Sequence, residues 1–88
     1  MVGCATTPPL DEYTLARTAL EAAKEQDSAR YAPSYFHQAE EQFREGEAKF
    51  KNHDYREAEE NFIQARQFAE KAENASRAQK YKSGEVGP

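Results

Sequence analysis

Residues 39–72 read AEEQFREGEAKFKNHDYREAEENFIQARQFAEKA, and this stretch, with Phe36 just before it, decides the fold. Its apolar and small residues recur at alternating intervals of three and four positions, and Glu, Lys, Arg and Gln fill the positions between them. That spacing gathers them on one face of a helix, whereas a strand would have scattered them. They are Phe36, Ala39, Phe43, Gly46 and Phe50 in the first half, then Tyr55, Ala58, Phe62, Ala65, Phe68 or Ala69, and Ala72. The sequence therefore predicts two amphipathic helices that share one core.

A short polar segment, residues 51–54 (KNHD), separates the two halves. Asp54 with Glu57 three positions later forms a capping-box-like pair, which predicts the start of the second helix there. So short a connection makes the two helices antiparallel neighbours. A glycine inside a helix costs roughly 1 kcal/mol relative to alanine. We therefore expect that a neighbouring backbone or aromatic ring comes close to Gly46.

A third helix is expected before the hairpin, over residues 11–28, where alanine dominates. Its apolar stripe consists of Tyr13, Ala16, Leu20 and Ala23, widened by Leu15, Ala19 and Ala22. Pro33 disfavours helical geometry at Ala32 and suits the first position of the next helix. The sequence thus predicts an all-α fold, a three-helix antiparallel bundle with helices over 11–28, 33–52 and 54–81. The last helix outruns its neighbour, and Ala75, Ala78 and Tyr81 of this overhang are expected to pack on the first helix.

Length and composition allow one small domain with a thin core, because the chain has 88 residues, 38% hydrophobic and 32% charged. We expect the domain over residues 11–82, a flexible tether over 1–10 and a disordered tail over 83–88. The net charge of −4 is uneven, with 13 acidic and 7 basic residues in 1–65 against 3 acidic and 5 basic in 66–88. Such sparse basic residues do not predict nucleic-acid binding.

No catalytic constellation is present, and we predict a protein that is not an enzyme and has no cofactor. His37 and His53 lie 16 positions apart, roughly 24 Å along a helix, so they cannot share a metal ion. The many glutamates are typical of solvated helix faces, with lysine or arginine four positions on. An accessory subunit of an enzyme remains an open alternative.

Eight residues of the hairpin follow the order and spacing of a tetratricopeptide repeat, to which this stretch is similar. They are Gly46, Ala48, Phe50, Asp54, Tyr55, Ala58, Phe62 and Ala65. The repeat's early aromatic residue is replaced by Gln42 and its leucine before the glycine by Glu45. Such repeats need about three copies to bury a continuous core, and one is found. A superhelical array within this chain is therefore not expected.

The chain opens Met-Val-Gly-Cys-Ala-Thr-Thr-Pro-Pro. Val-Gly-Cys-Ala before a Thr/Pro-rich tether resembles the lipobox of bacterial lipoproteins. This resemblance implies lipidation of Cys4 and a membrane anchor, and Ala5 is compatible with outer-membrane sorting. No basic and apolar export segment precedes Cys4 in the sequence as written. Either the sequence begins inside a longer precursor, or Cys4 is an ordinary thiol in an unstructured leader.

A second resemblance rests on an alanine-rich helix, the Tyr31-Ala32-Pro33 junction, a helix near Ala39-Glu40 and an Asp-Tyr-x-x-Ala hairpin. Over residues 4–75 the chain resembles an uncharacterised family of short bacterial envelope lipoproteins, a domain of unknown function. This implies an envelope protein and names no activity.

Four aromatic residues lie off or beside the main stripes: Tyr31, Tyr35, Phe68 and Tyr81. They are candidates for a surface that binds a partner protein or a second copy of the chain; alternatively, the first helix covers them. We expect a non-catalytic, lipid-anchored lipoprotein at the periplasmic face of the outer membrane, acting as a helical scaffold or interaction module for unidentified envelope proteins. The alternative is a soluble, unanchored interaction module or homodimer in which Cys4 is incidental.

Overall fold

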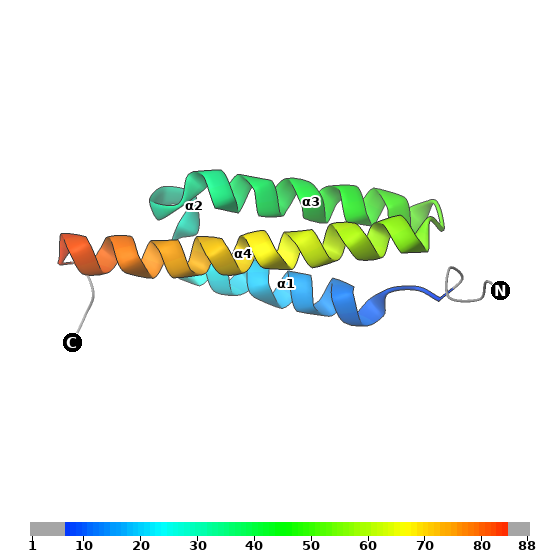
Figure 1. Ribbon diagram of the computed structural model, residues 1–88, viewed down its shortest axis with the longest axis horizontal. Helices are drawn as coiled ribbons and strands as arrows, with labels where there is room; N and C mark the ends of the chain where they lie inside the picture. The colour runs from blue at the N-terminus through cyan, green and yellow to red at the C-terminus, as the bar shows by residue number, and fades with distance from the viewer. Residues whose placement is uncertain (1–6, 85–88) are drawn as a thin grey trace.

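The computed structural model describes residues 7–84, which form four helices and no strand (Figure 1). The helices are α1 (Leu10–Glu25), α2 (Ser28–Tyr31), α3 (Pro33–Lys51) and α4 (Tyr55–Ser83). The all-α expectation is confirmed for these residues, but a fourth helix, the single turn α2, stands where three helices were predicted. Cys4 and residues 85–88 of the expected tail lie outside the described part of the chain.

Helix α4 is the longest element, and α1 and α3 lie along it on different sides (Figure 1). The colours of Figure 1 show that α3 runs opposite to α4, whereas α1 runs in the same direction as α4. The molecule is a rod with extents of 54 × 19 × 15 Å. The start of α1 and the α3–α4 turn share one end, and the last turns of α4 project beyond the other. We call these the tether end and the overhang end.

The first helix ends at Glu25, three residues earlier than predicted, because Asp27 adopts a left-handed conformation with φ of 60°. The carbonyl of Asp27 accepts hydrogen bonds from the N–H groups of Arg30 at 3.0 Å and Tyr31 at 3.1 Å, and these bonds close the turn of α2. An aspartate tolerates this backbone region better than most residues, and nothing in the sequence pattern marks it. Pro33 begins α3 as predicted.

The α3–α4 turn closes as a Schellman motif. The N–H of Asp54 donates to the carbonyl of Lys49 at 2.9 Å, and that of His53 donates to the carbonyl of Phe50 at 3.0 Å. His53 is the left-handed residue, with φ of 64°. Asp54 is the N-cap of α4, but its side chain makes no capping hydrogen bond. The expected capping box is therefore wrong, and the backbone closes the turn instead.

Alanines from three helices form most of the core, with Leu20, Phe36 and Phe62 as its large members. Between Phe68 and Ala69, the structure buries Ala69 completely and leaves Phe68 half-buried. Leu15, expected to widen the stripe of the first helix, is 48% exposed because it lies outside the face that meets α4. The buried apolar residues are Ala16, Ala19, Leu20, Ala23, Ala32, Phe36, Ala39, Ala58, Phe62, Ala65, Ala69 and Ala72.

The close approach expected at Gly46 is confirmed. A Cβ at this position would lie 2.6 Å from the nearest carbon of the Phe62 ring, well inside van der Waals contact. The ring is fully buried and packs against Tyr13 and Phe43, with centroid separations of 5.4 and 5.5 Å. The absence of a side chain at Gly46 thus makes room for the central aromatic residue of α4.

A buried serine pair ties α2 to α4. The hydroxyls of Ser28 and Ser76 lie 2.7 Å apart, and Ser28 also donates to the carbonyl of Ala72 at 3.2 Å. Both serines are fully buried, so the bonds form away from competing water. This pair fixes α2, whose last residue is Tyr31, against the second half of α4.

Candidate interaction surface

Two of the four predicted aromatic residues, Tyr31 and Tyr35, flank Pro33 at the junction of α2 and α3. They border a shallow, open depression of about 460 Å³ between this junction and α4. Tyr31 is half-buried and Tyr35 is 39% exposed. The depression is lined by Tyr31, Ala32, Pro33, Ser34, Tyr35, Ala75, Ala78, Gln79 and Lys82. Because most of its lining is apolar and it opens broadly to solvent, it fits a surface of another molecule better than an enclosed small ligand.

Cationic side chains lie over the aromatic rings. The Lys71 ammonium is 5.9 Å from the ring centroid of Tyr35 and 5.7 Å from that of Phe68. Over Tyr31, the Arg30 guanidinium lies at 4.9 Å and the Lys80 ammonium at 5.6 Å. These separations are within the range of cation–π attraction. Lys71 therefore joins Phe68 to Tyr35, so three of the four predicted residues form one surface.

Tyr81 stands apart from this group. It is 80% exposed and does not line the depression, so its expected packing on the first helix is wrong, although Gln26 at the end of α1 accepts a hydrogen bond from the neighbouring Lys80 at 3.0 Å. Ala75 packs against the core, and Ala78 is exposed in the depression. We call the depression together with Tyr31, Tyr35, Phe68 and their cations the tyrosine surface.

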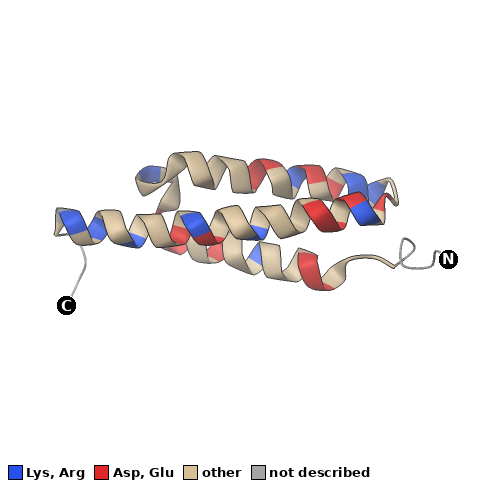
Figure 2. Ribbon diagram, in the orientation of Figure 1, with Lys and Arg blue, Asp and Glu red and all other residues tan. Residues whose placement is uncertain are grey.

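The charges divide along the rod. Helix α2 with its N-cap Asp27 and residues 66–84 carry six basic and three acidic residues, a net of +3, whereas α1 and residues 33–65 carry six basic and twelve acidic, a net of −6. Figure 2 shows basic residues toward the end of α4 and a mixture of acidic and basic residues along the rest of the rod. The tyrosine surface is thus the basic end of an acidic protein.

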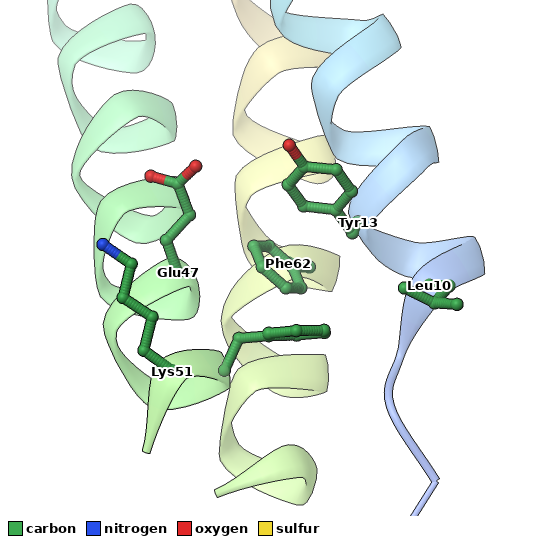
Figure 3. Close-up of a pocket in the computed structure, with 6 residues that line it drawn as sticks. Leu10, Tyr13, Glu47, Lys51 and Phe62 are labelled. Carbon is green, nitrogen blue, oxygen red and sulfur yellow. The ribbon is translucent and has the colours of Figure 1, made fainter. Parts of the chain in front are cut away.

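A second hollow, of about 380 Å³, lies at the tether end (Figure 3). Leu10 and Tyr13 of α1 border it on one side, Glu47 and Lys51 of α3 on the other, and the Phe62 ring of α4 lies between them. Phe50 completes its lining. The sequence pattern placed these aromatic residues in the core, so the hollow was not predicted. Beside the hollow, Tyr13 also stacks on Phe43 with 5.5 Å between ring centroids.

The two histidines are far apart in the fold. His37 lies near the start of α3, with Nδ1 3.7 Å from a carboxylate oxygen of Glu40, and His53 lies in the α3–α4 turn. Within residues 7–84, no cluster of three or more His, Cys, Asp or Glu residues could hold a metal ion. No helix in that range is long and apolar enough to span a membrane.

Residues 11–84 match the model of DUF4398, a domain of unknown function, and the chain belongs to this family. No curated protein matches the chain, and no solved structure does.

Proposed function

We propose that this protein is a non-catalytic lipoprotein, anchored through Cys4 to the periplasmic face of the outer membrane, where it serves as a small helical scaffold for other envelope proteins. The anchoring half rests on Val-Gly-Cys-Ala followed by the Thr/Pro-rich tether. The observation that supports the scaffold role is the tyrosine surface, where the partly exposed rings of Tyr31, Tyr35 and Phe68 lie at an open, largely apolar depression.

The shape of the rod separates the proposed anchor at one end from the proposed binding surface near the other. Thr7, the first residue that the structure describes, precedes α1 at the tether end, whereas the tyrosine surface lies beside the second half of α4. From Tyr55 to Gln79, α4 advances roughly 36 Å at 1.5 Å per residue. A lipid on Cys4 would therefore hold the tether end at the membrane and present the tyrosine surface to the periplasm.

We further propose that α3 and α4 pack in the manner of a single tetratricopeptide repeat within a three-helix antiparallel arrangement. The contact between Gly46 and the Phe62 ring supports this, because the resemblance includes both residues. At the position of the missing aromatic residue, the Gln42 side-chain oxygen accepts a hydrogen bond from Asn61 at 2.8 Å. A polar bond between the helices thus takes the place of an aromatic contact.

Intact mass and membrane fractionation, on protein expressed from its native locus with its upstream DNA, test the anchor. We expect a chain that begins at Cys4, carries added acyl mass and sediments with the outer membrane. Cys4→Ser is the control and should give a chain without acyl mass that is released from the membrane. An unmodified chain that retains Met1 and stays soluble would contradict the anchor and favour the unanchored module or homodimer.

A further inference from the structure

We propose that the tyrosine surface binds an acidic helical segment of a partner protein. This inference rests on the proposed scaffold role and names the chemistry of the partner. It follows from three properties of the surface: a stretch of α4 that α1 and α3 leave open to solvent, the cations Lys71 and Lys82, and a charge pattern that disfavours a symmetric dimer through this surface.

The uncovered stretch begins where α1 and α3 stop covering α4. Ala75 and Ala78 lie three positions apart on α4 and line the depression, with Lys82 one turn further. Small side chains on a helix allow a second helix to approach closely. Tyr31 and Tyr35 rise from the α2–α3 junction on the opposite side. The depression is therefore a shallow trough beside a helix, with apolar walls that suit apolar side chains of a docked helix.

The cations give the trough its preference for acidic partners. Lys71 stands over Tyr35 and Phe68, and Lys82 lines the trough itself. The nearby carboxylate of Glu73 lies 2.7 Å from Arg77, so its charge is already compensated. A carboxylate of the partner could approach Lys71 while an apolar neighbour packs on the Tyr35 ring. Both interactions would form at one place, and the charge pairing would speed association.

Charge also decides between candidate occupants. Two copies joined symmetrically through this surface would bring two regions of net charge +3 together, and juxtaposed like charges oppose association. An anionic membrane is disfavoured by position, because the proposed anchor lies at the opposite end of the rod. An acidic protein helix satisfies the apolar trough and the cations together.

Photo-crosslinking in the native host tests the proposal on the full chain. A photoreactive phenylalanine analogue is placed at Gln79, which lines the trough, and in a matched control at Gln64, which is also exposed on α4 but lies outside the trough. We expect Gln79 to crosslink to a protein segment in which Asp and Glu outnumber Lys and Arg, with at least fivefold higher yield than Gln64. Mass spectrometry of the crosslinked peptide reads that composition directly.

A pair of charge reversals supplies the second readout. Lys71→Glu with Lys82→Glu should lower the crosslink yield at Gln79 at least fivefold, whereas Lys49→Glu with Lys51→Glu, an identical change of net charge at the tether end, should alter it less than twofold. A crosslinked segment that is neutral or basic, a second copy of the chain, or a lipid would overturn the inference while leaving a binding surface in place. Equal, background-level yields at Gln79 and Gln64 would overturn the scaffold role as well.

Discussion

The two ends of the rod are built from the same residue types and use them differently. At the tether end, Tyr13, Phe43 and Phe62 pack against one another with centroid separations of 5.4 to 5.5 Å, and Gly46 makes room for the central ring. At the overhang end, Tyr31 and Phe68 are half-buried and Tyr35 is 39% exposed, with cations over their rings, and the buried contacts come from alanines, Leu20, Phe36 and two serines. The aromatic residues at the tether end stabilise the fold, whereas those of the tyrosine surface at the overhang end stay accessible to a partner.

The largest effect should come from the aromatic cluster. Phe62→Ala removes a fully buried ring, and such truncations cost about 3–5 kcal/mol. For a domain of this size, with a few kcal/mol of net stability, we expect most of the helical circular dichroism signal to be lost at 25 °C. Tyr35→Ala, at the surface of the other end, should change the free energy of unfolding by less than about 1 kcal/mol. Equal losses for both variants would remove the distinction between the two ends.

Gly46→Ala should destabilise the protein even though alanine is the better helix former. The new Cβ would lie 2.6 Å from the Phe62 ring, and overpacking costs about 1–3 kcal/mol, which outweighs the roughly 1 kcal/mol gained in helix propensity. Urea unfolding should therefore show a net loss of about 1 kcal/mol. In a Phe62→Leu background the same change should be neutral or stabilising. Destabilisation of equal size in both backgrounds would show that the ring is not the cause.

The serine pair at the overhang end should contribute less to stability than the aromatic cluster. Ser28→Ala or Ser76→Ala removes one side of a buried hydrogen bond, which we expect to cost about 1–2 kcal/mol in urea unfolding. The double variant should cost less than the sum of the two single ones, because Ser28→Ala leaves the buried Ser76 hydroxyl without its partner and the second change removes that hydroxyl. Strict additivity would mean that the two hydroxyls do not act together.

The smallest effect has the opposite sign. His53 occupies a left-handed conformation that glycine adopts without strain. His53→Gly should therefore raise the free energy of unfolding by about 0.5–1 kcal/mol, and the midpoint of thermal unfolding should rise with it. Asn52→Gly, at the preceding position where φ is −84°, is the control and should not stabilise. A loss of stability in His53→Gly would show that the contact of His53 with Tyr55, at 5.5 Å between centroids, matters more than backbone strain.

The hairpin was predictable because its signal is periodic and long. The alternation of three and four positions identified the face of Gly46 and Phe62 correctly, and Pro33 marked the start of α3. The break after α1 was harder to predict, because Asp27 turns the chain in a conformation usually signalled by glycine, and the left-handed conformation of His53 within the predicted turn had no signal for the same reason. The serine pair gave no signal either, since Ser28 was expected at the end of the first helix and only the fold brings it to Ser76, 48 positions away.

The candidate surface was predictable in part. Tyr31, Tyr35 and Phe68 departed from the apolar stripes, and the structure gathers them around Lys71 and the trough. Tyr81 also lies off the apolar stripes, yet it does not join the tyrosine surface, because the end of α4 extends beyond the other helices. The cations over the rings were not predicted, since Lys71 meets Tyr35 only through the packing of α3 on α4. The periodicity of the sequence shows which residues lie outside the core face of a helix, but it does not show which of them contact one another in the fold.

The most direct test of the account is a depth measurement on the acylated protein in lipid vesicles. Cys4 is the only cysteine in the sequence, so once its thiol carries a lipid, Asn52→Cys or Gln79→Cys provides a single reactive thiol for a fluorescent label at the tether end or the overhang end. We predict strong quenching by lipid-attached quenchers for the label at position 52 and little for the label at position 79, roughly 36 Å further along the rod. Equal quenching at both positions, or stronger quenching at position 79, would contradict a rod anchored at one end that presents its tyrosine surface at the other.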